Sequence, residues 1–189
     1  MSSTPQFKNL VDLCSQSVER FAGNEIFGDR QPDGTWTYIT YREFGDLVDQ
    51  ARGGLKSLGV EPGDRVAIIA NNRVEWAVTA YATYGVGACI VPMYEKQNAA
   101  DWGFIVADSG ARLLVVANQA IADKGREEFD RVDSLQHIVT LDGSGEGSFA
   151  ALLQAGKDAP AEPADPDPED LCGFIYTSGT TGNPKGVRL

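Results

Sequence analysis

The stretch RVAIIANNRVEWAVTAYATYGVGACIV, residues 65–91, decides the fold of this chain. Residues 65–70 are apolar after the first, and residues 88–91 form a second apolar run, as expected of parallel strands that are covered on both faces. Residues 72–84 between them are apolar on nearly every side, which predicts a buried helix capped by Asn72. A strand, a helix and a second strand in this order form a β-α-β unit.

The same alternation continues toward the C-terminus. Helices are predicted around residues 99–108 and 119–132, and each precedes a short apolar strand, at 113–116 and 137–141. This rhythm predicts an α/β fold, a doubly wound and mostly parallel sheet flanked by helices. Ligands of such sheets bind at the carboxyl ends of the strands.

Upstream of residue 65 the pattern is different. Apolar residues at spacings of three and four predict a helix over residues 7–22, and two short strands are predicted at 26–27 and 36–39. Thr40 and Glu43 form a capping box, in which each side chain satisfies a free backbone N–H group at the start of the next helix. Gly59 is the expected stop of that helix.

Residues 158–170 carry four prolines and six acidic side chains, which predicts a stiff, extended and solvated segment. A spacer between two structural units explains this composition, and a regulatory tail is the alternative. We therefore divide the chain into an N-terminal α/β subdomain of residues 1–158, a linker of residues 159–170, and the start of the next subdomain at residues 171–189.

The composition argues against several functions. A formal net charge of −11 argues against a nucleic-acid partner, because phosphate backbones require a basic surface. Three widely spaced cysteines and a single histidine offer no zinc-binding cluster and are typical of a cytoplasmic protein with reduced thiols. Residues 76–94 lack charge, but their glycines, proline and tyrosines favour a buried helix and strand over a transmembrane segment, so we expect at most peripheral membrane contact.

The chemistry is concentrated in YTSGTTGNPKG, residues 176–186, directly after an apolar run at 172–175. Glycine-rich backbone that leaves a buried strand can direct several N–H groups at one anion, usually a phosphate. Hydroxyl groups add donors along a polyphosphate, and Lys185 adds a positive charge. The P-loop pattern of nucleoside triphosphatases fails at Pro184, no Gly-x-Gly-x-x-Gly pattern is complete, and a plain surface turn is the alternative.

At every defined position this stretch resembles the phosphate-binding signature of adenylate-forming enzymes, the superfamily that includes acyl-CoA synthetases, amino-acid adenylation domains and luciferases. The resemblance extends to residues 35–44, 59–70 and 91–95, so it covers most of the chain. It is greatest for the long-chain fatty acid branch of the acyl-CoA synthetases. Amino-acid adenylation domains are the nearest alternative.

The resemblance implies a ligase that adenylates a carboxylate with ATP, releases pyrophosphate and transfers the acyl group to coenzyme A. It assigns the β and γ phosphates of ATP to the loop, gives magnesium a place near Thr180, and pairs Lys185 with the terminal phosphates. It assigns no catalytic residue within this chain. The residues implied in ATP binding are Thr177, Ser178, Gly179, Thr180, Thr181, Gly182 and Lys185.

The chain departs from this family in length, since it ends at Leu189, directly after the loop. The adenine contacts, the acyl pocket, an acidic magnesium ligand and a C-terminal domain with a catalytic lysine are missing from it. We therefore expect a truncated piece of a larger ligase that is inactive alone and self-associates through apolar surface left bare. A stand-alone phosphate-binding or interaction module without catalysis is the rival hypothesis.

Overall fold

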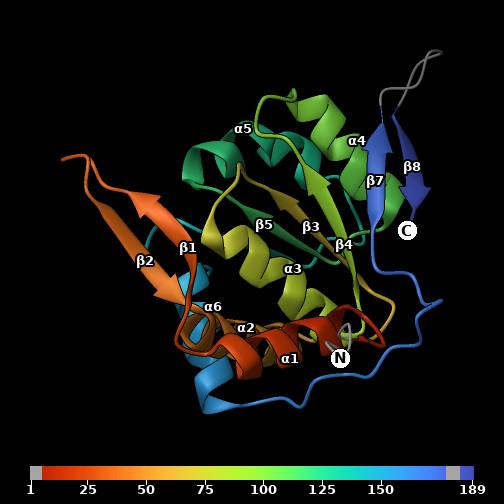
Figure 1. Ribbon diagram of the computed structural model, residues 1–189. Helices are drawn as coiled ribbons and strands as arrows, with labels where there is room; N and C mark the ends of the chain where they lie inside the picture. The colour runs from red at the N-terminus through yellow and green to blue at the C-terminus, as the bar shows by residue number, and fades with distance from the viewer. Residues whose placement is uncertain (1–5, 178–183) are drawn as a thin grey trace.

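A computed structural model of the chain describes residues 6–177 and 184–189 (Figure 1). Its helices are α1 (Leu10–Phe21), α2 (Tyr41–Ser57), α3 (Val74–Val86), α4 (Ala99–Ser109), α5 (Gln119–Phe129) and α6 (Phe149–Asp158). Its strands are β1 (Glu25–Arg30), β2 (Trp36–Thr40), β3 (Arg65–Ile69), β4 (Cys89–Met93), β5 (Leu113–Val116), β6 (His137–Thr140), β7 (Phe174–Thr177) and β8 (Lys185–Arg188).

A parallel four-stranded sheet with the order β4-β3-β5-β6 forms the centre of the fold. The chain adds β4 on one side of β3 and then β5 and β6 on the other, which confirms the predicted doubly wound arrangement. Helices α2, α3 and α6 cover one face, while α4 and α5 pack together on the opposite face (Figure 1). Both faces of β3 are therefore buried, and residues 66–69 are 0% exposed.

The start of α2 follows the sequence prediction closely. The Thr40 backbone N–H donates to the Glu43 carboxylate at 2.7 Å, and the Glu43 N–H donates to the Thr40 hydroxyl at 3.3 Å. Both halves of the predicted capping box are thus present. At the other end Gly59 has a φ of +77°, a left-handed conformation that stops the helix and that glycine adopts without strain.

The predicted cap of α3 is wrong. The N-cap residue is Arg73 rather than Asn72, and no side chain caps this helix. Arg73 instead directs its guanidinium at the Glu75 carboxylate in the first turn, with Nε donating at 2.8 Å. This bond joins two side chains and leaves the first backbone N–H groups of α3 without a side-chain cap.

Helix α6 was absent from the sequence prediction. It follows the glycines of residues 143–147, where the left-handed conformations of Gly143, Gly145 and Gly147 build an irregular turn. Ser148 caps the helix, since its hydroxyl accepts from the Ala151 N–H at 3.2 Å. The serine cap and the apolar residues at Phe149 and Leu152 were the available signals.

Residues 160–167 form no helix or strand, and hydrogen bonds fasten them to the domain. Arg52 Nε donates to the carbonyl oxygen of Ala161 at 2.7 Å, the Ala164 N–H donates to Gly85 at 2.8 Å, and Asn9 Nδ2 donates to Pro166 at 2.8 Å. Arg52 is 8% exposed, so its charge lies under this segment. The acidic and proline-rich segment is thus extended and mostly exposed, as predicted, and these bonds hold it along α2, α3 and α1.

Glycine allows α2 and α6 to cross at close range. A Cβ added at Gly53 would lie 2.7 Å from the Ala159 carbonyl oxygen, and one added at Gly156 would overlap the carbonyl oxygen of Gln50. Neither position has room for a side chain, because backbone atoms rather than flexible side chains lie opposite. The two helices consequently pack backbone against backbone.

We predict that Gly156→Ala lowers the free energy of unfolding by about 3 kcal/mol, because the added methyl group overpacks this crossing. Intrinsic helix propensity alone predicts the opposite sign, a gain of roughly 0.5–1 kcal/mol. Urea denaturation followed by circular dichroism measures the difference. Gly23→Ala is the control, since nothing lies within 4 Å of a Cβ at Gly23, and a stabilised Gly156→Ala variant would contradict the close crossing.

Candidate functional site

Strand β7 carries the predicted phosphate-binding sequence out of the domain beside β4. The Ile90 N–H donates to the Cys172 carbonyl oxygen at 3.0 Å, and Ile90 and Gly173 form a parallel bridge. Because β7 runs parallel to β4, its carboxyl end points the same way as the carboxyl ends of the central sheet (Figure 1). The carboxyl end of β7, at Thr177, therefore lies on the side where ligands of α/β sheets bind.

Strands β7 and β8 form an antiparallel hairpin that brings two predicted site residues together. Thr177 and Lys185 are its last register pair, and both are exposed. A hydroxyl donor and an ammonium group thus lie on neighbouring strands, at the end of the hairpin where β7 stops and β8 begins. The other predicted ATP-binding residues lie outside the described residues, namely Ser178, Gly179, Thr180, Thr181 and Gly182.

A second feature of the hairpin was invisible to sequence reasoning. Tyr176 in β7 donates a hydrogen bond from Oη to Asp108 Oδ2 in the last turn of α4, at 2.6 Å. Burial and then this bond raise the pKa of the Tyr176 phenol above its usual value, so the hydroxyl remains a donor. The hairpin is therefore attached to the domain through a side chain as well as through β4.

Charged side chains after β3 and β6 are paired with one another. Arg73 donates from Nε to Glu75 at 2.8 Å and from Nη2 to Asp142 at 2.9 Å. The bond from Arg73 holds the pKa of the Glu75 carboxyl below its usual value, against the opposing effect of burial. Nearby, the Asn71 N–H donates to Glu95 Oε1 at 2.7 Å and joins the ends of β3 and β4. The cation of Arg73 is thus engaged locally, which leaves Lys185 as our candidate for a phosphate.

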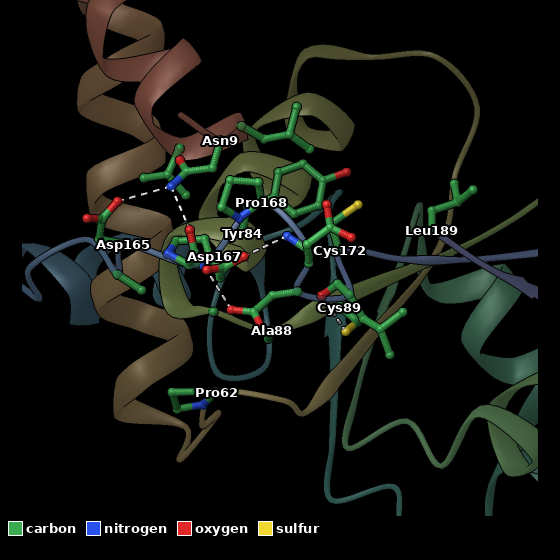
Figure 2. Close-up of a pocket in the computed structure, with 18 of the residues that line it drawn as sticks. Asn9, Pro62, Tyr84, Ala88, Cys89, Asp165, Asp167, Pro168, Cys172 and Leu189 are labelled. Atoms are coloured by element: carbon green, nitrogen blue, oxygen red, sulfur yellow. Dashed lines mark hydrogen bonds between the residues drawn. The ribbon is translucent and has the colours of Figure 1, made fainter. Parts of the chain in front are cut away.

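A cavity of about 1080 Å³ lies at the opposite end of the strands, away from the predicted chemistry. Figure 2 shows Tyr84, Cys89, Cys172 and Leu189 around it, and Asp165 of the linker closes one side. Burial raises the pKa of Tyr84 to about 12, as expected beside apolar neighbours. We place the candidate site at the hairpin despite the size of this cavity, because the cavity lies at the amino ends of β3 and β4.

Thr180, the residue predicted to lie near magnesium, is outside the described residues. Within residues 6–177 and 184–189, no three His, Cys, Asp or Glu side chains gather as metal ligands would. Across the same residues, no helix has both the length and the apolar character needed to cross a bilayer.

Comparison with known proteins identifies clear relatives. A family model described as AMP-binding enzyme matches residues 14–189. A long-chain-fatty-acid–CoA ligase of Mycobacterium bovis is 36% identical over 181 residues, which covers 90% of this chain and 29% of the relative. A ligase of the same description from Bos taurus is 28% identical, over 100% of this chain and 27% of its own length. The chain thus spans less than a third of these relatives.

Solved structures agree with the sequence comparison. An anthranilate CoA ligase crystallised in complex with anthranoyl-AMP superimposes with a TM-score of 0.83 at 28% identity, over 98% of this chain and 35% of that one. A fatty acyl CoA synthetase of Mycobacterium tuberculosis superimposes with a TM-score of 0.79 at 25% identity, over 96% of this chain and 34% of that one. The α/β fold of the chain is therefore that of the N-terminal part of such enzymes.

The pairing of Arg73 with Glu75 generates a pH-dependent prediction. The pKa of the Glu75 carboxyl is lower in the folded chain than in the unfolded chain, where it is about 4.3. The ionised carboxylate therefore stabilises the fold fully above the unfolded pKa. This stabilisation is lost as the pH falls through the folded pKa. We predict that Glu75→Gln lowers the free energy of unfolding at pH 7 by about 0.5–1 kcal/mol, a value reduced for partial solvent screening.

Urea denaturation of both proteins between pH 7 and pH 3 measures this difference, which should narrow steadily below about pH 4. Glu19→Gln on the exposed surface of α1 is the matched control and should match the wild type at every pH. A Glu75→Gln deficit that stays constant down to pH 3 would contradict the assigned ion pair.

Proposed function

This chain belongs to the AMP-binding enzyme family, and from that premise we propose that the whole protein is an ATP-dependent acid–thiol ligase. The reaction joins a carboxylate to AMP with release of pyrophosphate, and coenzyme A then displaces AMP to give a thioester. The observation that carries this proposal is the β7–β8 hairpin, which sets Thr177 opposite Lys185 on the ligand-binding side of a parallel sheet.

The role proposed for the hairpin is to neutralise the departing pyrophosphate. The hydroxyl of Thr177 and the ammonium group of Lys185 are donors suited to phosphate oxygens, and charge on those oxygens grows as pyrophosphate leaves. A hydrogen bond between charged groups contributes about 1.5–3 kcal/mol. In the same proposal, Ser178, Gly179, Thr180, Thr181 and Gly182 complete the cradle for the β and γ phosphates, and magnesium accompanies ATP near Thr180.

The proposed substrate is a long-chain fatty acid. Two of the relatives described above carry the name long-chain-fatty-acid–CoA ligase, and the chain is 36% and 28% identical to them. We also propose a cytoplasmic location with peripheral membrane contact, because a fatty acid and its thioester partition into bilayers. No acyl pocket is assigned to residues 6–177 and 184–189.

Residues 1–189 alone are proposed to be inactive. One hairpin supplies phosphate contacts, but the chain covers only 29% of its Mycobacterium bovis relative, so most of the surface of a ligase site lies elsewhere. We predict that the isolated chain gives no ATP–pyrophosphate exchange with fatty acids of any length. Exchange above background by this chain would overturn its proposed inactivity.

In the complete ligase, we predict that Lys185→Ala lowers kcat/KM for ATP by about 10- to 100-fold, which is the loss of one charge-assisted phosphate contact. Steady-state exchange kinetics measure this loss. Lys157→Ala is the matched control, since Lys157 is an exposed lysine in the last turn of α6. If the two variants had the same kcat/KM for ATP, Lys185 would not be a phosphate ligand.

We further propose that the isolated chain self-associates through the exposed face of the hairpin. Ile175 and Val187 form a register pair and are 39% and 47% exposed, beside Leu189 at 57%. Large exposed apolar groups side by side favour association. Light scattering should show a mass above that of the monomer at high concentration, and the double variant Ile175→Thr/Val187→Thr should lower it. A monomeric wild-type chain would refute this proposal.

A further inference from the structure

Tyr176 contacts three separate parts of the molecule. Its backbone belongs to β7, its hydroxyl donates to Asp108 at 2.6 Å, and its ring covers Gly186 of β8. The hydrogen bond joins residues 68 positions apart in the sequence, so it is a tertiary contact rather than a local one. Figure 1 shows β7 beside α4, the helix that supplies Asp108.

Gly186 has no side chain and so leaves space for the ring of Tyr176. Tyr176 and Gly186 are partners in the antiparallel register, and a Cβ at Gly186 would lie 3.0 Å from Tyr176 Cζ and 3.2 Å from its Oη. A side chain at position 186 would require the phenol to shift by a few tenths of an ångström. Because φ of Gly186 is not in the left-handed region, space for the ring, rather than backbone conformation, is the reason for glycine here.

The same tyrosine is adjacent to both candidate phosphate donors. Thr177 follows Tyr176 directly, and Lys185 precedes Gly186, so each donor is one residue from the contact. Successive side chains of a strand point to opposite faces. Tyr176 therefore faces α4, while the next register pair presents its side chains on the other face of the hairpin.

We propose that Tyr176 is a positioning residue for ATP, whose bond to Asp108 and packing on Gly186 hold Thr177 and Lys185 in place against the parallel sheet. Its catalytic consequence depends on the proposed ligase function. A charge-assisted bond of this length restricts the rotation of the hairpin about its attachment to β4. Donors fixed in advance of binding lose less entropy when the phosphates arrive, so affinity for ATP is the quantity that the contact raises.

Tyr176→Phe tests the contact in the 189-residue chain, because it removes the hydroxyl and keeps the ring on Gly186. We expect amide hydrogen exchange at Ile175, Thr177, Lys185 and Val187 to accelerate about 3- to 10-fold, and Asp108→Asn to give a smaller change in the same direction. Amides of β5 serve as an internal reference. Tyr38→Phe is the matched control, since Tyr38 is 51% exposed on the other hairpin.

Steady-state kinetics of the complete ligase distinguish a positioning role from a purely structural one, because a purely structural role would leave KM for ATP unchanged. We expect Tyr176→Phe to raise KM for ATP about 3- to 10-fold, with kcat and KM for the carboxylate unchanged. Asp108→Asn should also raise KM for ATP. Unchanged exchange in the hairpin of Tyr176→Phe overturns the contact. Faster exchange with an unchanged KM for ATP overturns its positioning role.

The failure of the ligase proposal gives a different pattern. A wild-type ligase without ATP–pyrophosphate exchange refutes the proposed function, and with it the assignment of ATP as the ligand that Tyr176 serves. The exchange rates in the 189-residue chain then still decide whether Tyr176 fixes Thr177 and Lys185. The two proposals are therefore tested by separate measurements.

Discussion

Burial of β3 on both faces is the constraint on which the rest of the domain depends. Residues 66–69 are fully buried between β4 and β5, so helices must cover the sheet above and below. The only charged residue of the strand, Arg65, lies at its amino end, where Nε donates to the Ser109 carbonyl oxygen and Nη2 to that of Gly110, both at 2.7 Å. The strand thereby anchors the C-terminus of α4, and α4 in turn holds Asp108 for Tyr176.

That constraint also fixes where chemistry can occur. Parallel strands place their carboxyl ends together, and the bridge between Ile90 and Gly173 gives β7 the same direction. The segment of residues 160–167 makes this possible, because the chain must return from α6 to the start of β7. Its bonds from Arg52 and Asn9 hold the returning chain against the domain, so they help to position the start of β7.

Most of the fold could be read from the sequence because its signals are local. Apolar runs identified the four central strands, and the Thr40–Glu43 pair identified the start of α2. The failures have tertiary causes. Arg73, rather than Asn72, is the N-cap residue of α3, and its side chain bonds to Asp142, 69 residues away. Helix α6 packs on α2 through glycines that are distant in the sequence. For the same reason the sequence pattern predicted a phosphate motif but gave no sign of Asp108, whose partner is 68 residues distant.

A site that we propose for a polyphosphate on an acidic chain requires that nearby carboxylates do not repel the ligand. The net charge is −11, yet the acidic groups that follow the central strands accept hydrogen bonds from neighbours: Glu75 and Asp142 from Arg73, and Glu95 from the Asn71 backbone. Each such bond offsets part of the negative potential at the carboxyl edge, where Debye screening leaves only nearby charges important. The proposed phosphate contact of Lys185 acts over a short range, because the remaining negative charge of the chain is screened by salt.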